Sequence, residues 1–293
     1  MPRFLFPLLF FALLAGSLQA QVQVGIRIKR RLYVVYEPLI VTVAIRNLSG
    51  RDLPLADEGG QQWFSFQVLR DDNQPVPPLN PNYQLPPLIV PAGQTVERTV
   101  NLNTLYPLHD FGLYRIRANL YFSPRQQYFQ SPPVSVEISE GRKLWQQEVG
   151  IPEGSPGGGG TRRYSVLSFR QPAANYLYIR VEDVETGMVY ATFPVGRLIS
   201  GMEPQIKLDL ANTLNVLQVT GPKTYLYTQV GLNGELMMQD TYYAEKTRPT
   251  LKLDKTGRLS IVGGRLSQGG PGPDAPPPGV PKLSDRPVEL PKF

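Results

Sequence analysis

Short stretches in which apolar and polar residues alternate, each ended by a turn, recur through most of this sequence. In residues 22–35, for example, Ile26 and Ile28 alternate with Arg27 and Lys29, so one face of an extended chain is apolar and the other charged. The 293-residue chain contains 30 prolines and 27 glycines, which end such stretches, and 15 tyrosines, which favour sheets. The pattern predicts an all-β protein, and the length is sufficient for two domains.

The first twenty residues have the layout of a secretory signal peptide. A short positive start, Met1–Arg3, precedes an apolar run, Phe4–Ala15. This run is shorter than the roughly 20 residues that a membrane-spanning helix needs. We expect cleavage after Ala20, with cleavage after Ser17 as the alternative. The mature protein is therefore expected to be exported to the periplasm or out of the cell, with no transmembrane segment.

Residues 21–140 are expected to form a first domain. They contain seven runs typical of short strands, with turn residues between them. The runs are residues 22–35, 39–46, 63–69, 85–90, 95–102, 114–122 and 134–138. Their number and spacing predict a Greek-key β-sandwich.

A local motif lies at the start of the sixth run. Asp110, Gly112 and Tyr114 belong to the sequence Asp-Phe-Gly-Leu-Tyr-Arg-Ile, which resembles the D-x-G-x-Y-x-C corner of immunoglobulin domains. Ile116 takes the place of the cysteine. The resemblance extends to exported bacterial immunoglobulin-like domains and covers residues 22–139 as architecture. It implies that the three motif residues are structural, and that the Tyr114 hydroxyl bonds back to the backbone of the corner.

The order of turns and strands is also similar to that of bacterial proteinase inhibitors related to the intracellular inhibitor of subtilisin. The shared features are the turn at Asn47, the strand at Phe66, the turn at residues 91–93 and the strand at residues 112–114. This similarity implies a common architecture. A protease inhibitor built in this way would act through an exposed loop such as Gln74–Pro87, which its prolines stiffen.

Two stretches rich in glycine and proline lack the alternating pattern. Residues 141–163 contain four consecutive glycines, Gly157–Gly160, and are expected to be a Gly-rich linker. Within it, Lys143–Val149 is expected to form a helical turn. Residues 267–293 contain repeated Pro-Gly and Pro-Pro steps and are expected to be a disordered Pro-rich tail.

Residues 164–266, between linker and tail, repeat themselves. Val166–Tyr178 recurs as Val216–Tyr227, shifted by 50 and then 49 positions. Pro204–Asp209 recurs as Pro249–Asp254, shifted by 45. Antiparallel four-stranded units of this length resemble β-propeller blades, but only about two are present and a closed propeller needs about four. We expect the repeats to pack as two sheets; a ring closed with another chain, which would make the protein oligomeric, is the alternative.

Doubled tyrosines mark corresponding places in the repeats. Tyr176 and Tyr178 share one face of their expected strand, and Tyr225 and Tyr227 share the same face of theirs. If exposed, the four rings would form a ribbon on which sugars or an extended peptide stack, so they are the candidate binding residues. If buried, they fill the contact between neighbouring sheets. We favour this second interpretation, because a common packing role explains the repetition.

The composition excludes most catalytic and metal chemistry. The chain has no cysteine and a single histidine, His109, whose neighbour Asp110 points away from it in a turn. We therefore expect no catalytic residue, no metal site and no cofactor. The acidic pairs Asp57-Glu58, Asp71-Asp72 and Glu182-Asp183 fall in turns or hairpins, where solvation explains them.

The net charge of +6 is spread evenly along the chain. No expected segment has more than two basic residues in excess of its acidic ones. A protein that binds nucleic acid needs a concentrated basic patch to displace counterions, so no nucleic-acid partner is expected.

These features predict an exported, non-enzymatic binding or structural protein of the bacterial envelope or extracellular space. Its two β domains would contact a protein or glycan partner. Two alternatives remain open. One is a hydrolase of polysaccharide or peptide, with carboxylates brought together by the fold; the other is a protease inhibitor that acts through the Gln74–Pro87 loop.

Overall fold

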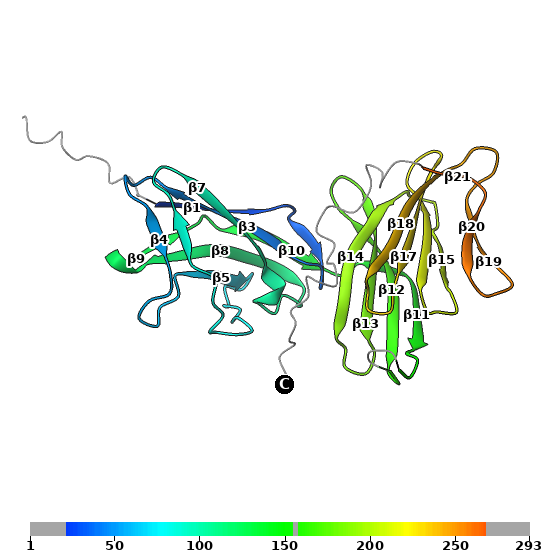
Figure 1. Ribbon diagram of the computed structural model, residues 1–293, viewed down its shortest axis with the longest axis horizontal. Helices are drawn as coiled ribbons and strands as arrows, with labels where there is room; N and C mark the ends of the chain where they lie inside the picture. Colours follow the sequence, from blue (N-terminus) through cyan, green and yellow to red (C-terminus); the bar gives the residue numbers. More distant parts are fainter. Residues whose placement is uncertain (1–21, 155–157, 268–293) are drawn as a thin grey trace, which may run out of the picture.

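The computed structural model describes residues 22–154 and 158–267 (Figure 1). In this part of the chain all regular structure is β-strand except for two short 3₁₀ turns, Leu102–Thr104 and Ser123–Arg125, so the all-β prediction is confirmed. No helix in the described residues has the length and hydropathy to cross a membrane.

Three expectations concern residues outside this description. The signal peptide expected at residues 1–20 and the tail beyond Ser267 are among them, as are residues 155–157, which include the first of the four consecutive glycines in the expected linker.

Residues 22–139 form two sheets with a common core, here called the N-terminal sandwich. The strands are β1 Val22–Ile28, β2 Leu32–Val34, β3 Ile40–Asn47, β4 Leu53–Leu55, β5 Phe64–Arg70, β6 Leu88–Val90, β7 Thr95–Asn101, β8 Gly112–Phe122, β9 Gln127–Gln130 and β10 Val134–Ser139. One sheet has the order β1-β3-β7 and the other β2-β10-β8-β5, with β9 paired to β8. Strands β4 and β6 form a separate small sheet. All pairs are antiparallel except β2 with β10.

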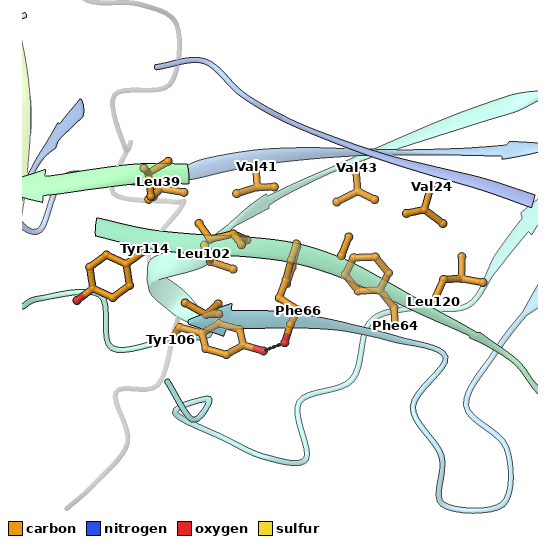
Figure 2. Packing of buried hydrophobic residues seen from close by; sticks show 14 of the residues in the cluster. Val24, Leu39, Val41, Val43, Phe64, Phe66, Leu102, Tyr106, Tyr114 and Leu120 are labelled. Atoms are coloured by element: carbon orange, nitrogen blue, oxygen red, sulfur yellow. Dashed lines mark hydrogen bonds between the residues drawn. The ribbon is translucent and has the colours of Figure 1, made fainter. Parts of the chain in front are cut away.

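The core of this sandwich follows from the alternation in its strands. Val41 and Val43 of β3 face Phe64 and Phe66 of β5, and each is at most 5% exposed (Figure 2). Burial of each such side chain stabilises the fold by about 1.5–3 kcal/mol. The hydroxyl of Tyr106 donates to the carbonyl of Phe66 at 2.6 Å, so this buried polar group also has a partner.

The run at residues 22–35, expected to be one strand, is two strands in different sheets. β1 pairs with β3, whereas β2 pairs with β10 in the opposite sheet, and the chain crosses between the sheets at residues 29–31. Strands β4 and β9 were not expected, because runs of three or four residues carry too little alternation to be recognised.

Residues 142–266 form the C-terminal sandwich. Its strands are β11 Arg142–Gly150, β12 Thr161–Arg170, β13 Asn175–Asp183, β14 Val189–Leu198, β15 Gln205–Leu208, β16 Leu214–Val219, β17 Thr224–Val230, β18 Leu236–Tyr243, β19 Thr250–Leu253, β20 Leu259–Val262 and β21 Arg265–Leu266. Two antiparallel sheets, β11-β12-β13-β14 and β15-β16-β17-β18-β21, share one hydrophobic core. The hairpin β19–β20 is a third, two-stranded sheet.

Much of the expected linker is a strand, and the helical turn expected over Lys143–Val149 is wrong. β11 pairs with β12 along its whole length, with a register shift between Lys143 and Trp145. The strand places Leu144, Trp145 and Val149 against the core of the C-terminal sandwich and pairs their backbone groups in a ladder. An isolated helical turn could not satisfy these backbone groups, because its end carbonyls and amides lack internal partners.

The sequence repeats correspond to equivalent strands. A shift of 50 residues places β12 on β16, and a shift of 49 places β13 on β17; these are the second and third strands of the two large sheets. Leu177 and Ile179 from one sheet contact the cluster that contains Leu214 and Val216 from the other. The two large sheets therefore pack face to face. A shift of 45 relates β15 and β16 to the hairpin β19–β20.

Candidate binding cleft and the junction between the sandwiches

Segments at the end of the N-terminal sandwich that lies away from the C-terminal sandwich line a cleft. Figure 1 shows one of these segments, the hairpin of β8 and β9, at that end. The volume of the cleft is about 550 Å³, which is within the range of small-ligand sites. Three segments distant in sequence form its walls: the start of β1, the loop between β3 and β4, and the hairpin β8–β9. The lining residues are Val22, Ser49, Gly50, Arg51, Asp52, Leu53, Phe122, Pro124, Arg125 and Phe129.

The loop on one side of the cleft is held from below by Asn47, which is fully buried. Its Nδ2 donates to the carbonyls of Arg51 at 2.8 Å and Val90 at 2.9 Å. Its Oδ1 accepts from the amide of Ser49 at 2.9 Å. The carboxylate of Asp52 accepts from the amide of Ala92 at 3.0 Å, which ties the loop to the next turn. This wall of the cleft is therefore fixed before any ligand arrives.

The hairpin β8–β9 forms the opposite wall. Phe122 and Phe129 are half-buried and pack on the sandwich core with one face toward the cleft. On the other side of the hairpin, the rings of Tyr121 and Tyr128 lie 4.7 Å apart, and Gln61 Nε2 donates to the Tyr128 hydroxyl at 2.6 Å. This cross-strand aromatic pair stiffens the hairpin.

The cleft combines an apolar floor with a charged rim. The floor is formed by Phe122, Phe129 and Leu53, and the rim carries Arg51, Asp52 and Arg125. Ser49 and Asp52 are the residues of the lining that could act as nucleophiles, and the lining contains no histidine to serve as their base. The cleft is thus suited to holding a ligand that has an apolar or ring face and polar or anionic groups.

The residues of the immunoglobulin-type motif lie at the other end of the same sandwich. The Tyr114 hydroxyl donates to the carbonyl of Asp110 at 2.9 Å, which is the bond that the resemblance implied. Gly112 has φ +132°, a backbone conformation that favours glycine. Burial raises the pKa of the Tyr114 phenol, in keeping with a packed, neutral ring. Asp110 also forms an ion pair with Arg70 at 2.8 Å.

The four candidate tyrosines divide into two buried and two half-buried rings. Tyr178 is fully buried and packs with Leu167 against Val34, which belongs to the N-terminal sandwich. Tyr227 is 5% exposed and packs under the hairpin β19–β20 against Leu251. Tyr176 and Tyr225, the half-buried pair, lie at the borders of these two contacts. Tyr178 and Tyr227 therefore do not form an exposed ribbon, and the ligand-binding interpretation does not describe them.

Charged side chains surround Tyr178 where the two sandwiches meet. Its hydroxyl accepts from Arg30 Nη1 at 2.8 Å and from Gln171 Nε2 at 3.1 Å. Arg30 also forms an ion pair with Glu37, which is 4% exposed and accepts from the amide of Val34 at 3.2 Å. Burial raises the pKa of Glu37, while Arg30 and these hydrogen bonds oppose the rise. The contact thus joins the sandwiches through a buried, hydrogen-bonded cluster.

A second buried cation crosses the same junction. Arg180 is 8% exposed and donates to the carbonyl of Val35 at 3.0 Å and to Thr192 Oγ1 at 3.2 Å. Its guanidinium lies 5.3 Å from the ring of Tyr36, which in turn stacks on His109. Tyr36 has φ +68°, an uncommon conformation for a residue with a side chain. Burial lowers the pKa of Arg180.

The acidic pairs singled out in the sequence are used in structural contacts. Asp183 pairs with the buried Arg162, and Glu182 pairs with Arg163 at 2.7 Å. Asp57 accepts from the amide of Trp63 at 2.9 Å. In the part of the chain that the structure describes, no three histidine, cysteine, aspartate or glutamate side chains gather as a metal site. His109 is exposed.

Sequence reasoning missed the cleft, although it recognised the turn at Asn47 that supports one wall. In comparisons with known proteins, no protein-family model matches this chain, and no curated protein is significantly similar to it. The function is therefore inferred from the cleft, the junction and the strand edges.

Proposed function

We propose that this is an exported, non-enzymatic binding protein that holds a protein or glycan partner in the cleft of the N-terminal sandwich. The observation that carries the proposal is the cleft itself, with aromatic rings in its floor and two arginines at its rim. Aromatic faces take up sugar rings or apolar side chains, and arginines bind carboxylates or other anions through paired hydrogen bonds. The fixed loop above Asn47 lowers the entropy that binding would cost.

We further propose that the N-terminal sandwich is an immunoglobulin-like Greek key and that the C-terminal sandwich consists of two blade-like repeat units. The crossing of the chain from β1 to β2 in the opposite sheet supports the first assignment, as does the bond from Tyr114 to its corner. Loops at one end of such sandwiches commonly bind partners, because a rigid scaffold positions them. The cleft lies in this kind of place.

Export to the periplasm or the exterior belongs to the same proposal and rests on residues 1–20. Expression in a bacterium followed by N-terminal mass analysis tests it. The expected mature protein begins at Gln21, or at Leu18 by the alternative cleavage. Recovery of the uncleaved chain from the cytoplasm would contradict export.

Binding is best tested on arrays of polysaccharide fragments and of extended peptides. The wild-type protein is expected to retain a subset of one array, and the double variant Arg51→Ser/Arg125→Ser to lose at least about tenfold in affinity for it. Arg46→Ser is the matched control, because Arg46 is exposed on β3 but does not line the cleft. Equal binding by the wild type and the double variant, or no binding to either array, would contradict the proposal.

A second candidate function is protease inhibition through residues 74–87, and one observation favours it. Gln62 Nε2 donates to the carbonyls of Pro81 at 3.0 Å and Tyr83 at 2.8 Å, and Trp63 Nε1 donates to Leu85 at 3.1 Å. The loop is thus held in one conformation from the inside. Leu79, at its tip, is 53% exposed.

Such a loop would occupy a protease cleft without rearranging. If it does, the protein should inhibit subtilisin or chymotrypsin, and Leu79→Asp should abolish the inhibition while leaving the fold intact. Full protease activity in a large excess of the wild-type protein, or rapid cleavage of the loop, would rule this function out.

A further inference from the structure

The hairpin β19–β20 forms the end of the molecule farthest from the N-terminal sandwich (Figure 1). One of its faces packs on the sheet of β15–β18, where Leu251 and Ile261 contact Leu217 and Tyr227. By sequence the hairpin is the start of a third repeat, since it corresponds to β15–β16 at a shift of 45 residues.

This third repeat has fewer strands than the other two. In the second repeat, the hairpin β15–β16 continues into β17 and β18 of the same sheet. After β20, by contrast, the described chain returns to the second repeat and pairs there with β18 as β21. Within the described residues the third sheet therefore has two strands, where each of the other repeats contributes four.

The two strands of this hairpin differ at their outer edges. The amide of Asp254 donates to the carbonyl of Arg258 at 2.9 Å across the turn, which sets the ladder. In the resulting register, Leu251 and Ile261 oppose one another without sharing hydrogen bonds, so their N–H and C=O groups point outward. On β19 these groups are used: the Leu251 amide donates to Gln205 Oε1 at 2.9 Å, and its carbonyl accepts from Lys207 Nζ at 3.4 Å.

On β20 the outward backbone groups belong to Leu259 and Ile261. No described residue pairs with this side of the strand, since β20 has β19 as its only partner strand in the described chain. Residues 259–262 have the sequence Leu-Ser-Ile-Val, with no charge and no proline. Edge strands that stay exposed to solvent usually carry charged residues or prolines that block pairing, and β11 carries Arg142 and Lys143. An edge strand without charges or prolines is expected to be covered by another strand.

We propose that β20 is a dimerisation edge, which pairs antiparallel with β20 of a second copy of this chain about a two-fold axis at Ser260. In this register Leu259 lies opposite Ile261 of the partner subunit, and the outward N–H and C=O groups of both residues form the ladder. The combined sheet, β19-β20-β20-β19, has the four strands of a complete repeat.

The charges next to the strand favour a second copy as the occupant. Arg258, the charged residue that adjoins β20, lies opposite Val262 of the partner subunit, so no like charges face each other across the axis. Ser260 faces Ser260 of the partner subunit, a small neutral pair. Val262 is 45% exposed and would lose part of this apolar surface to water on pairing.

Sedimentation of the mature chain, residues 21–293, over a range of concentrations tests the proposal. We expect a reversible monomer–dimer equilibrium. Leu259→Pro removes an outward N–H but no bond to β19, and because the change occurs twice in the dimer it should raise the dissociation constant at least about tenfold. Met237→Ser is the matched control: it removes a side chain that is 60% exposed on β18, away from the edge, and should dimerise like the wild type.

Hydrogen exchange of the wild type provides a readout that does not depend on the folding of the proline variant. The amides of Leu259 and Ile261 should become protected as the protein concentration rises. Sedimentation as a monomer throughout with rapid exchange of both amides would overturn the proposal. A dimer of unchanged affinity in Leu259→Pro would overturn it too.

Discussion

Two buried charged side chains in this protein, Arg162 and Glu37, have oppositely charged partners that explain why they tolerate burial. Arg162 is 2% exposed, pairs with Asp183 and donates to the Tyr190 hydroxyl at 2.9 Å, with its guanidinium 4.2 Å from the Tyr190 ring. Glu37 and Arg30 form a similar pair at the junction. An unpaired charge in such surroundings costs several kcal/mol, so removal of one partner should be felt mainly as lost stability.

Asp183→Asn tests the Arg162 pair. Hydrogen bonds from Thr186, together with Arg162, hold the pKa of Asp183 below its usual value of 3.8. A lowered carboxyl pKa contributes stability that is present above that value and is lost as the pH falls through the lowered pKa. Asp183→Asn should therefore cost about 3 kcal/mol near neutral pH and less in acid. Urea denaturation near pH 7 and near pH 3 measures the difference.

Asp254→Asn is the matched control for this prediction. Asp254 caps the turn between β19 and β20 by accepting from the amides of Thr256 at 2.8 Å and Arg258 at 2.9 Å. Its pKa is also lowered, first by the Thr256 hydroxyl, but no buried arginine depends on it. It should lose clearly less stability than Asp183→Asn. Equal losses would show that the buried pair contributes nothing beyond a turn cap.

Tyr114→Phe tests the corner of the N-terminal sandwich. Removal of the hydroxyl leaves the Asp110 carbonyl without its donor, so we expect a loss of about 0.5–3 kcal/mol in the free energy of unfolding. Tyr121→Phe, on the same strand but half-buried, is the control and should be close to neutral. An unchanged denaturation midpoint for Tyr114→Phe would remove the support that this bond gives to the immunoglobulin-like assignment.

The repeated strands β13 and β17 each contribute one tyrosine that packs against a neighbouring element. Tyr178 of β13 packs against the N-terminal sandwich, and Tyr227 of β17 packs against the hairpin β19–β20. The Tyr227 hydroxyl also donates to Asn215 Oδ1 at 2.5 Å, and the Asn215 side chain is fully buried. The outer faces of both large sheets are therefore covered at equivalent places, by different elements.

Alanine substitution should separate the buried from the half-buried rings. Tyr178→Ala and Tyr227→Ala are expected to cost about 3–5 kcal/mol each, as for other large aromatic truncations in cores. Tyr176→Ala and Tyr225→Ala should cost less, because these rings are only partly buried. Thermal and urea unfolding of the four variants measures the order. Wild-type stability of Tyr178→Ala or Tyr227→Ala would contradict the packing role.

Strands with clear alternation and clear turns could be predicted from sequence, whereas elements defined by distant partners could not. β5 lies at residues 64–70, within one residue of the run expected at residues 63–69. β11 was missed because the glycines after it suggested a linker, while its strand conformation depends on pairing with β12. Tyr178 is buried by contact with Val34, which is more than a hundred residues away in the sequence.

The candidate cleft was beyond sequence reasoning for the same reason. Its walls come from Val22, the loop at residues 49–53 and the hairpin at residues 122–129, and none of these carries a motif for binding. The turn at Asn47 was visible in the sequence. Its role in supporting the cleft depends on bonds to Arg51 and Val90, which only the folded chain brings within reach.

The whole molecule is an elongated series of layers with a different surface at each end (Figure 1). The cleft lies at one end, and the edge of β20 lies at the other. Between them, Arg30, Glu37 and Tyr178 form one part of the junction and Arg180 the other. If the junction is rigid, a dimer through β20 would present two clefts at fixed, opposed positions.

Rigidity of the junction can be measured directly, because a chain without cysteine allows two introduced cysteines to be spin-labelled specifically. We would label Thr99→Cys on β7 and Lys223→Cys in the turn between β16 and β17, both at exposed positions, and dilute the sample with unlabelled protein to remove distances between copies. Dipolar spectroscopy should give one narrow distance distribution, and it should broaden in Tyr178→Ala, which removes the centre of the junction. A broad distribution in the wild type, unchanged by Tyr178→Ala, would show that the two sandwiches move independently.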